Sequence, residues 1–178
     1  MSIETLREQL PEYARDLKLN LGSVLTPSGA PGLSQQQIAS LALATAIAAR
    51  NTPLVQAVES WATGQLDPAQ VAAARAAAAI MGMNNIYYRF LHLVEDGEYQ
   101  NLPARLRMNV IGNPGIDRLD FELLSLAVSA VNGCGLCVTA HERKLRAGGV
   151  SREAIQSAVR IAAVMHAVAV VLDYQAAA

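Results

Sequence analysis

Apolar residues recur at helical spacing along almost the whole chain, and residues that begin or end helices interrupt them. Ser34, Asp67 and Ser151 each stand where a side-chain oxygen can cap a new helix, and the proline after Asp67 suits a first helical turn. The pattern therefore predicts an all-α fold. The expected helices cover about 2–10, 11–21, 34–50, 54–64, 68–95, 122–131, 134 onward and 152–174, with a loop at 22–32, a short helix or turn at 102–109 and a corner at 111–116.

The stretch 121–150 holds both cysteines of the chain and one of its three histidines. Asn132-Gly133 ends the apolar helix before the cysteines in the manner of a C-cap, because glycine adopts positive φ without strain. A second helix is expected to start at Cys134. Cys134, Cys137 and His141 are spaced by three and four positions, so two thiols and an imidazole should share one helical face.

Composition supports a single helical domain, residues 1–178. Hydrophobic residues make up 52% of the chain, enough for a substantial core, and aromatic residues only 4%. Abundant alanine suits close helix packing and argues against a β-sandwich. The formal net charge of -1 provides neither a basic field for nucleic acid nor a polybasic patch for a membrane. Neither nucleic acid nor membrane is therefore an expected partner.

The ends of the chain and its cysteine content bear on its location. The first 20 residues are polar and charged, unlike a signal peptide, and the longest apolar stretch, Ile161–Leu172, is shorter than the roughly 20 residues that span a bilayer. We therefore expect a cytoplasmic protein. Two cysteines arranged as CxxC in a reducing compartment favour redox or metal chemistry over a structural disulfide.

Two halves of the sequence resemble each other. Residues 41–59 align with 124–142 at an offset of 83, and residues 66–82 align with 150–166 at an offset of 84. The same order of helix, break, helix, cap and long apolar helix recurs, which predicts an internal duplication with repeats at about 33–95 and 116–174. In the first repeat Asn51, Leu54 and Val58 take the places of Cys134, Cys137 and His141, so the second repeat is expected to carry the chemistry.

A set of motifs in order resembles a known family. CGLC followed by AHE, a glutamate twelve residues before the first cysteine, and the runs MGMNNIYYRF, LRMNVIGNPGI and LPEYARDLKLNL together resemble the alkyl hydroperoxidase D group of the carboxymuconolactone decarboxylase-like superfamily. The resemblance extends over almost the whole chain. It implies an internally duplicated, all-helical subunit that forms a homotrimer and carries no bound cofactor.

The resemblance also implies an activity. Members of this group are antioxidant peroxidases that reduce alkyl hydroperoxides and hydrogen peroxide, with lipoyl groups as the reducing substrate. The implied partners are a lipoyl-bearing acyltransferase protein and a peroxiredoxin of the alkyl hydroperoxide reductase system. The implied catalytic residues are Glu122, Cys134, Cys137 and His141. Some relatives have a second imidazole between the cysteines, where this chain has Leu136.

Reasoning from the residues leads to the same four side chains. If the helices on either side of Asn132-Gly133 form an antiparallel hairpin, Glu122 should meet His141 before it meets Cys134. The expected order along the groove is then Glu122, His141, Cys137, Cys134, with the glutamate orienting an imidazole that takes the thiol proton. The helix dipole favours Cys134 as the reactive thiolate, whereas the neighbouring base favours Cys137. The family resemblance decides for Cys137, which forms the sulfenic acid, with Cys134 as proton donor and resolving thiol.

These residues allow other interpretations. A zinc site would need four ligands, and His92 and His166 lack the spacing to complete one. Apart from the family, Glu122 could equally serve the dipole of a helix N-terminus. The side chains expected to be structural are His92, His166, Trp61, Met81 and Met83. Tyr87 and Tyr88 are expected to pack between helices or at a subunit contact. The cations Arg143, Lys144 and Arg146 are expected to form a solvated helix face rather than a patch that attracts an acidic partner domain.

Two other classes of function are compatible with the sequence. A lactone decarboxylase of the same superfamily would have no need of the CxxC. A non-catalytic helical binding module would leave the combination of glutamate, two cysteines and histidine unexplained. Replacing both cysteines distinguishes these alternatives from the peroxidase.

Overall fold

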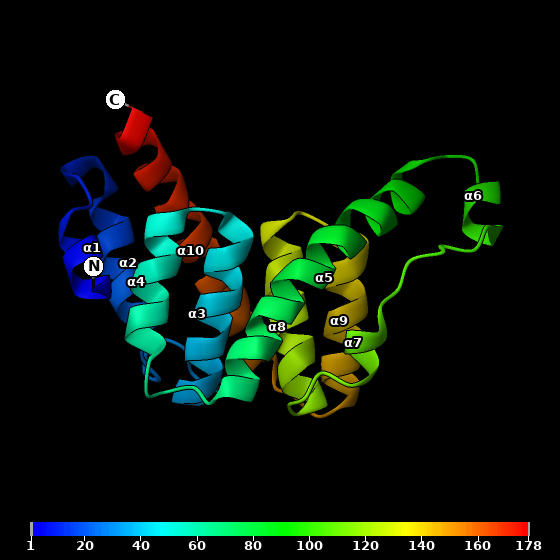
Figure 1. Cartoon of the computed structure of the whole chain (residues 1–178), viewed down its shortest axis with the longest axis horizontal. Helices are drawn as coiled ribbons and strands as arrows, with labels where there is room; N and C mark the ends of the chain where they lie inside the picture. The colour runs from blue at the N-terminus through cyan, green and yellow to red at the C-terminus, as the bar shows by residue number, and fades with distance from the viewer. Residues whose placement is uncertain (1, 178) are drawn as a thin grey trace.

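The computed structural model describes residues 2–177 and consists almost entirely of helices (Figure 1). Among these residues no strand forms, and one isolated bridge pairs Thr63 with Leu66. The all-α prediction is confirmed. The helices are α1 Ile3–Glu8, the 3-10 turn η1 Glu12–Ala14, α2 Arg15–Val24, α3 Gln35–Ala49, α4 Thr52–Ala62, α5 Pro68–Leu93, α6 Glu98–Asn101, α7 Asn109–Gly112, α8 Arg118–Val131, α9 Gly135–Ala147 and α10 Arg152–Ala177.

Four helices make the centre of the molecule. Helices α5 and α10 each pack against both α3 and α8, and α3 also packs against α8 (Figure 1). Outside this centre α4 covers α3, and α9 covers α8. Helix α3 is buried on all sides from Ile38 to Ala46, which explains why its sequence is apolar without a polar face.

Side-chain caps set the starts of the long helices as the sequence predicts. Ser34 and Asp67 each form a capping box, with Gln37 and Gln70 respectively as the third helical residue. The hydroxyl of Ser151 accepts a hydrogen bond from the backbone N–H of Ala154 at 3.0 Å. These caps satisfy backbone donors that a helix start otherwise leaves unpaired.

Two local predictions are wrong. The loop expected from residue 22 begins only after Val24, because α2 continues through Gly22. A Cβ at Gly22 would lie 2.6 Å from a guanidinium nitrogen of Arg7, so this glycine makes room for α1 and does not end its helix. Residues 103–108 are neither helix nor turn: Leu102, which precedes Pro103, is extended, and Arg105 has a positive φ of 51°.

The last turns of α5 and the whole of α6 project from the body as an arm (Figure 1). Helix α6 has no buried residue. We use the term arm for residues 86–108. Its exposed large apolar side chains are Ile86, Phe90, Leu93, Tyr99 and Leu102.

Helix α10 is long and apolar enough to cross a membrane by length and composition alone. The apolar stretch Ile161–Leu172 lies within this longer helix of 26 residues. However, 56% of its most apolar window is buried inside the protein. This burial is typical of the core helix of a soluble protein.

The helices follow the order that the duplication predicts. Helices α3, α4 and α5 have 15, 11 and 26 residues, and α8, α9 and α10 have 14, 13 and 26. The duplication itself, with repeats at 33–95 and 116–174, stays a prediction, as does the trimer.

Candidate active site

The turn between α8 and α9 places the first cysteine. Gly133 has a φ of 69°, the left-handed conformation expected of it. Cys134 follows as the N-cap of α9, and its Sγ accepts a hydrogen bond from the backbone N–H of Cys137 at 3.3 Å. The predicted helix start at Cys134 is confirmed.

The two cysteines form a disulfide. The bond joins Cys134 to Cys137, whose Cα atoms are 5.3 Å apart. Cys134 is fully buried, whereas Cys137 keeps 7% of its surface exposed. The structure therefore represents the oxidised form of the pair, and Cys137 is the more exposed residue of the two.

Glu122 and His141 meet across the hairpin, one turn beyond the disulfide. The imidazole Nδ1 donates to Glu122 Oε2 at 2.6 Å, and the two side chains expose only 11% and 13% of their surface. The contact expected between Glu122 and His141 is confirmed. Because Nδ1 is bonded to the carboxylate, Nε2 is the nitrogen left to exchange a proton with a thiol.

Lys144 joins this pair through a contact that the sequence does not predict. Its ammonium donates to Glu122 Oε1 at 3.0 Å, although 58% of the lysine side chain is exposed. The side chain thus lies on a solvated helix face, as expected. The bond to Glu122 forms because Lys144 lies three residues after His141, one turn along α9, and its long side chain reaches back to α8.

The surroundings of Glu122 keep it ionised. Burial alone raises the pKa of this carboxyl, but hydrogen bonds and charge interactions with His141 and Lys144 outweigh the burial and hold the pKa below the ordinary 4.5. Glu122 is therefore a carboxylate at neutral pH, able to fix the tautomer and orientation of the imidazole.

A buried polar network, which the sequence analysis did not predict, lies between α5 and α8. Asn85 Nδ2 donates to Ser129 Oγ at 2.8 Å, and Asn132 Nδ2 donates to Asn85 Oδ1 at 2.9 Å. Arg89 donates to the carbonyl oxygen of Asn132 at 2.8 Å, next to the turn that leads to the disulfide. The signal in the sequence is a row of polar residues, 122, 125, 129 and 132, on one face of an otherwise apolar helix.

Two buried polar atoms near this network have no hydrogen-bond partner among residues 2–177. They are Asn84 Oδ1 on α5 and Ser125 Oγ on α8. Ser125 lies one turn along α8 from Glu122. Both atoms are exceptions to the general pairing of buried polar groups.

The other side chains singled out from the sequence lie elsewhere. The prediction that His92 and His166 are structural is wrong, because both are exposed in the chain. Met81 is buried as expected of a core residue, and Leu136 is 41% exposed beside the disulfide. The remaining ones are partly buried (Trp61, Met83, Tyr87, Tyr88 and Arg146) or exposed (Arg143).

The site has the residues for thiol chemistry. Within residues 2–177, no group of three or more His, Cys, Asp or Glu side chains is arranged to hold a metal ion. The donor set at the hairpin is instead a dithiol pair, an imidazole and a carboxylate, which suits proton transfer coupled to thiol oxidation.

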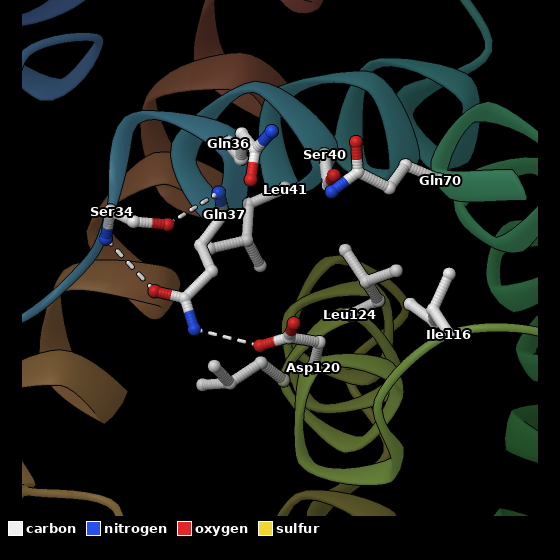
Figure 2. Close-up of a pocket in the computed structure, with 10 residues that line it drawn as sticks. Ser34, Gln36, Gln37, Ser40, Leu41, Gln70, Ile116, Asp120 and Leu124 are labelled. Carbon is white, nitrogen blue, oxygen red and sulfur yellow. Dashed lines mark hydrogen bonds between the residues drawn. The ribbon is translucent and has the colours of Figure 1, made fainter. Parts of the chain in front are cut away.

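A small cavity of about 70 Å³ lies between the starts of α3 and α8, away from the disulfide (Figure 2). Figure 2 shows Gln37 bridging the two helices: its Oε1 accepts from the backbone N–H of Ser34, and its Nε2 donates to Asp120 Oδ1 at 2.7 Å. None of the four predicted catalytic residues lines this cavity. Gln37 thereby ties the start of α3 to Asp120 at the start of α8, two residues before Glu122.

Comparison with known proteins identifies the family of this chain. Residues 97–178, which include both cysteines, match the Carboxymuconolactone decarboxylase family. The chain is 58% identical over 177 residues to alkyl hydroperoxide reductase AhpD of Gluconacetobacter diazotrophicus, covering 99% of this chain and 96% of that protein. It is also 58% identical over 177 residues to AhpD of Rhodospirillum centenum (99% and 94% covered), and 56% identical over 167 residues to AhpD of Coxiella burnetii (94% of each). At this identity and coverage, the chain belongs to the alkyl hydroperoxide reductase AhpD family.

Proposed function

We propose that the protein is a peroxidase that reduces alkyl hydroperoxides and hydrogen peroxide through a dithiol/disulfide cycle of Cys134 and Cys137. The observation that carries the proposal is the disulfide at the start of α9, one turn before an imidazole that is bonded to a buried carboxylate. The relatives are named alkyl hydroperoxide reductases, which agrees with this chemistry.

In the oxidative half of the cycle, His141 takes the proton of the Cys137 thiol. The thiolate attacks the outer peroxide oxygen, the O–O bond breaks, and the alkoxide leaves with a proton from Cys134. Cys137 is now a sulfenic acid. The Cys134 thiolate attacks its sulfur and expels hydroxide, which His141 protonates to water. In sum, two thiols and one hydroperoxide give one disulfide, one alcohol and one water.

In the reductive half, a dihydrolipoyl group supplies two electrons and two protons. Its thiolate attacks the sulfur of Cys137, the more exposed of the two, and Cys134 leaves. The backbone N–H of Cys137 that caps Cys134 Sγ stabilises the departing thiolate. The second lipoyl thiol then displaces Cys137 and closes the lipoyl disulfide.

The proposal includes partners. The dithiol is carried by a lipoyl-bearing acyltransferase protein, and electrons pass on to a peroxiredoxin, all in the cytoplasm. The protein acts as a homotrimer. The arm supports self-association, because its backbone projects from the body (Figure 1) and its five large apolar side chains are exposed, so that a second copy can cover them.

The test is peroxide consumption by the purified protein with and without dihydrolipoamide. We expect turnover only with the dithiol. Cys137→Ser should abolish it, and Cys134→Ser should stop after one equivalent of peroxide with a sulfenic acid on Cys137 that dimedone labels. Removing the base with His141→Ala should lower turnover by about 10²- to 10⁴-fold. Unlabelled Cys137 in the Cys134→Ser protein, or full activity of Cys137→Ser, would contradict the assignment.

The double variant with both cysteines replaced by serine tests the alternatives. A lactone decarboxylase would keep its activity on lactones in this variant. A binding module would show no peroxide turnover in any form. The peroxidase should lose all dithiol-dependent turnover while keeping its helical fold, which circular dichroism measures.

A further inference from the structure

Lys144 forms a hydrogen bond to Glu122 Oε1, the carboxylate oxygen that His141 does not contact. His141 Nδ1 bonds Oε2 at 2.6 Å and Lys144 Nζ bonds Oε1 at 3.0 Å, so each carboxylate oxygen has its own nitrogen partner. Both partners come from α9, three residues apart, and reach across to α8. The lysine side chain is 58% exposed and the glutamate side chain 13%, so the ammonium is the partner nearer to solvent.

The second partner of Glu122 affects whether His141 can act as a base. If an imidazole were the one cationic partner of a buried carboxylate, the negative charge would favour the protonated imidazole. A protonated imidazole cannot accept a proton from a thiol. A second, permanent cation on the same carboxylate supplies the missing charge. The imidazole can then stay neutral, with Nδ1–H donated to the carboxylate and Nε2 open.

We propose that Lys144 is a positioning residue of the site: by balancing the charge of Glu122, it leaves His141 unprotonated and ready to accept the thiol proton. The catalytic role of Lys144 rests on the proposed peroxidase function. The effect of Lys144 on the protonation of His141 involves only Glu122, His141 and Lys144.

The other charged groups on the helices packed around the site are bonded elsewhere or make no contact with it. On α8, Asp120 pairs with Gln37. On α5, Arg75 pairs with Glu59 and Arg89 donates to the carbonyl of Asn132. On α10, Arg160 donates to Ser157. Among the described residues, Glu122 is bonded to His141 and Lys144. No hydrogen bond or ion pair joins Glu122 to the remaining charged or titratable side chains considered, which are Glu142, Arg143, His92, His166, Arg152, Glu153 and Asp173.

The first test follows the histidine directly in the disulfide form. NMR titration of the imidazole C–H resonances gives the pH midpoint of each of the three histidines, with His92 and His166 as exposed internal references. Removing a nearby cation favours the protonated imidazole. Lys144→Met should therefore raise the His141 midpoint by roughly half a pH unit or more, allowing for the exposure of the lysine.

Two variants serve as controls. Lys144→Arg keeps the cation and should leave the His141 midpoint near that of the parent protein. Arg143→Met removes the same charge from the neighbouring exposed position, which does not contact Glu122, and should change the midpoint much less. An unchanged midpoint in Lys144→Met, or an equal shift in Arg143→Met, would overturn the proposal.

The second test measures turnover against pH. The acid limb of kcat/KM should move up in Lys144→Met by the same amount as the NMR midpoint, so that activity at low pH falls about threefold and recovers at high pH. A loss that is equal at every pH would show a structural role and contradict the proposal. Because the titration needs no turnover, an inactive parent protein would refute the peroxidase function without touching the result for Lys144.

Discussion

Replacing Glu122 with glutamine tests the energetics of the site. Glutamine keeps the size of the side chain but offers one acceptor oxygen in place of two and bears no charge. It can therefore accept a hydrogen bond from His141 or from Lys144, but cannot pair with both as the carboxylate does. The unfolding free energy and its pH dependence should both change.

The expected loss of unfolding free energy follows from how exposed the two partners of Glu122, His141 and Lys144, are. A hydrogen bond to a charged group contributes about 1.5–3 kcal/mol, and an exposed ion pair about 0–1 kcal/mol. The bond to buried His141 belongs to the first class, and the bond to Lys144, 58% exposed, to the second. Glutamine avoids the cost of burying a charge, which offsets part of the loss. We expect Glu122→Gln to lower the unfolding free energy by about 1–2 kcal/mol at neutral pH.

The pH dependence has a definite sign. The pKa of Glu122 is lowered in the folded protein, so its ionisation stabilises the fold above the unfolded-state value of 4.5. This contribution is lost as the pH falls through the lower, folded-state pKa. The difference between the parent protein and Glu122→Gln should therefore be full at about pH 7 and shrink steadily below about pH 4.5.

Urea unfolding of the disulfide form, followed by circular dichroism at a series of pH values, measures this difference. Glu95→Gln, at an exposed position without a hydrogen bond, is the matched control and should change stability little at any pH. A Glu122→Gln difference that stays constant from neutral to acid pH, or that is absent at neutral pH, would refute the account of the site.

Three further predictions concern the scaffold. Phe121→Ala removes a side chain that is 1% exposed and should cost about 3–5 kcal/mol of unfolding free energy in urea, whereas Leu93→Ala, 71% exposed, should cost little. Asn85→Ala leaves buried Ser129 and half-buried Asn132 without this partner and should cost about 1–3 kcal/mol, with faster amide hydrogen exchange at the turn before the disulfide. Gly29→Ala should lower the melting temperature markedly, because its Cβ would lie 2.1 Å from a backbone oxygen, while Gly82→Ala, with open space around it inside α5, should raise it slightly.

The sequence was sufficient to predict the hairpin and its contact between Glu122 and His141. The positive φ of Gly133 and the spacing of three and four along α9 fix which side chains meet, whatever the rest of the chain does. Lys144 is exposed as expected, but its bond to Glu122 was not predicted, because a polar residue near the end of a helix is normally solvated and its partner lies 22 positions earlier in the chain. Its place depends on how closely α8 and α9 approach, which no local pattern specifies.

Gly22 shows a second limit. Glycine ends helices often, and the sequence around residue 22 is compatible with such an end. The structure keeps the helix because the glycine lies against Arg7 of another helix. The network around Asn85 also joins residues more than 40 positions apart, so its members were visible in the sequence but their pairing was not.

The caps of α4 and α9 bear on how the chemistry arose. Asn51 Oδ1 accepts the backbone N–H of Leu54 at 2.9 Å, and Cys134 Sγ accepts that of Cys137 at 3.3 Å. An amide oxygen and a sulfur thus do the same structural work at two helix starts of one chain. A mutation between asparagine and cysteine at such a position leaves the helix capped. Redox activity could therefore be gained or lost in this lineage by substitution at a helix start, with the architecture inherited unchanged.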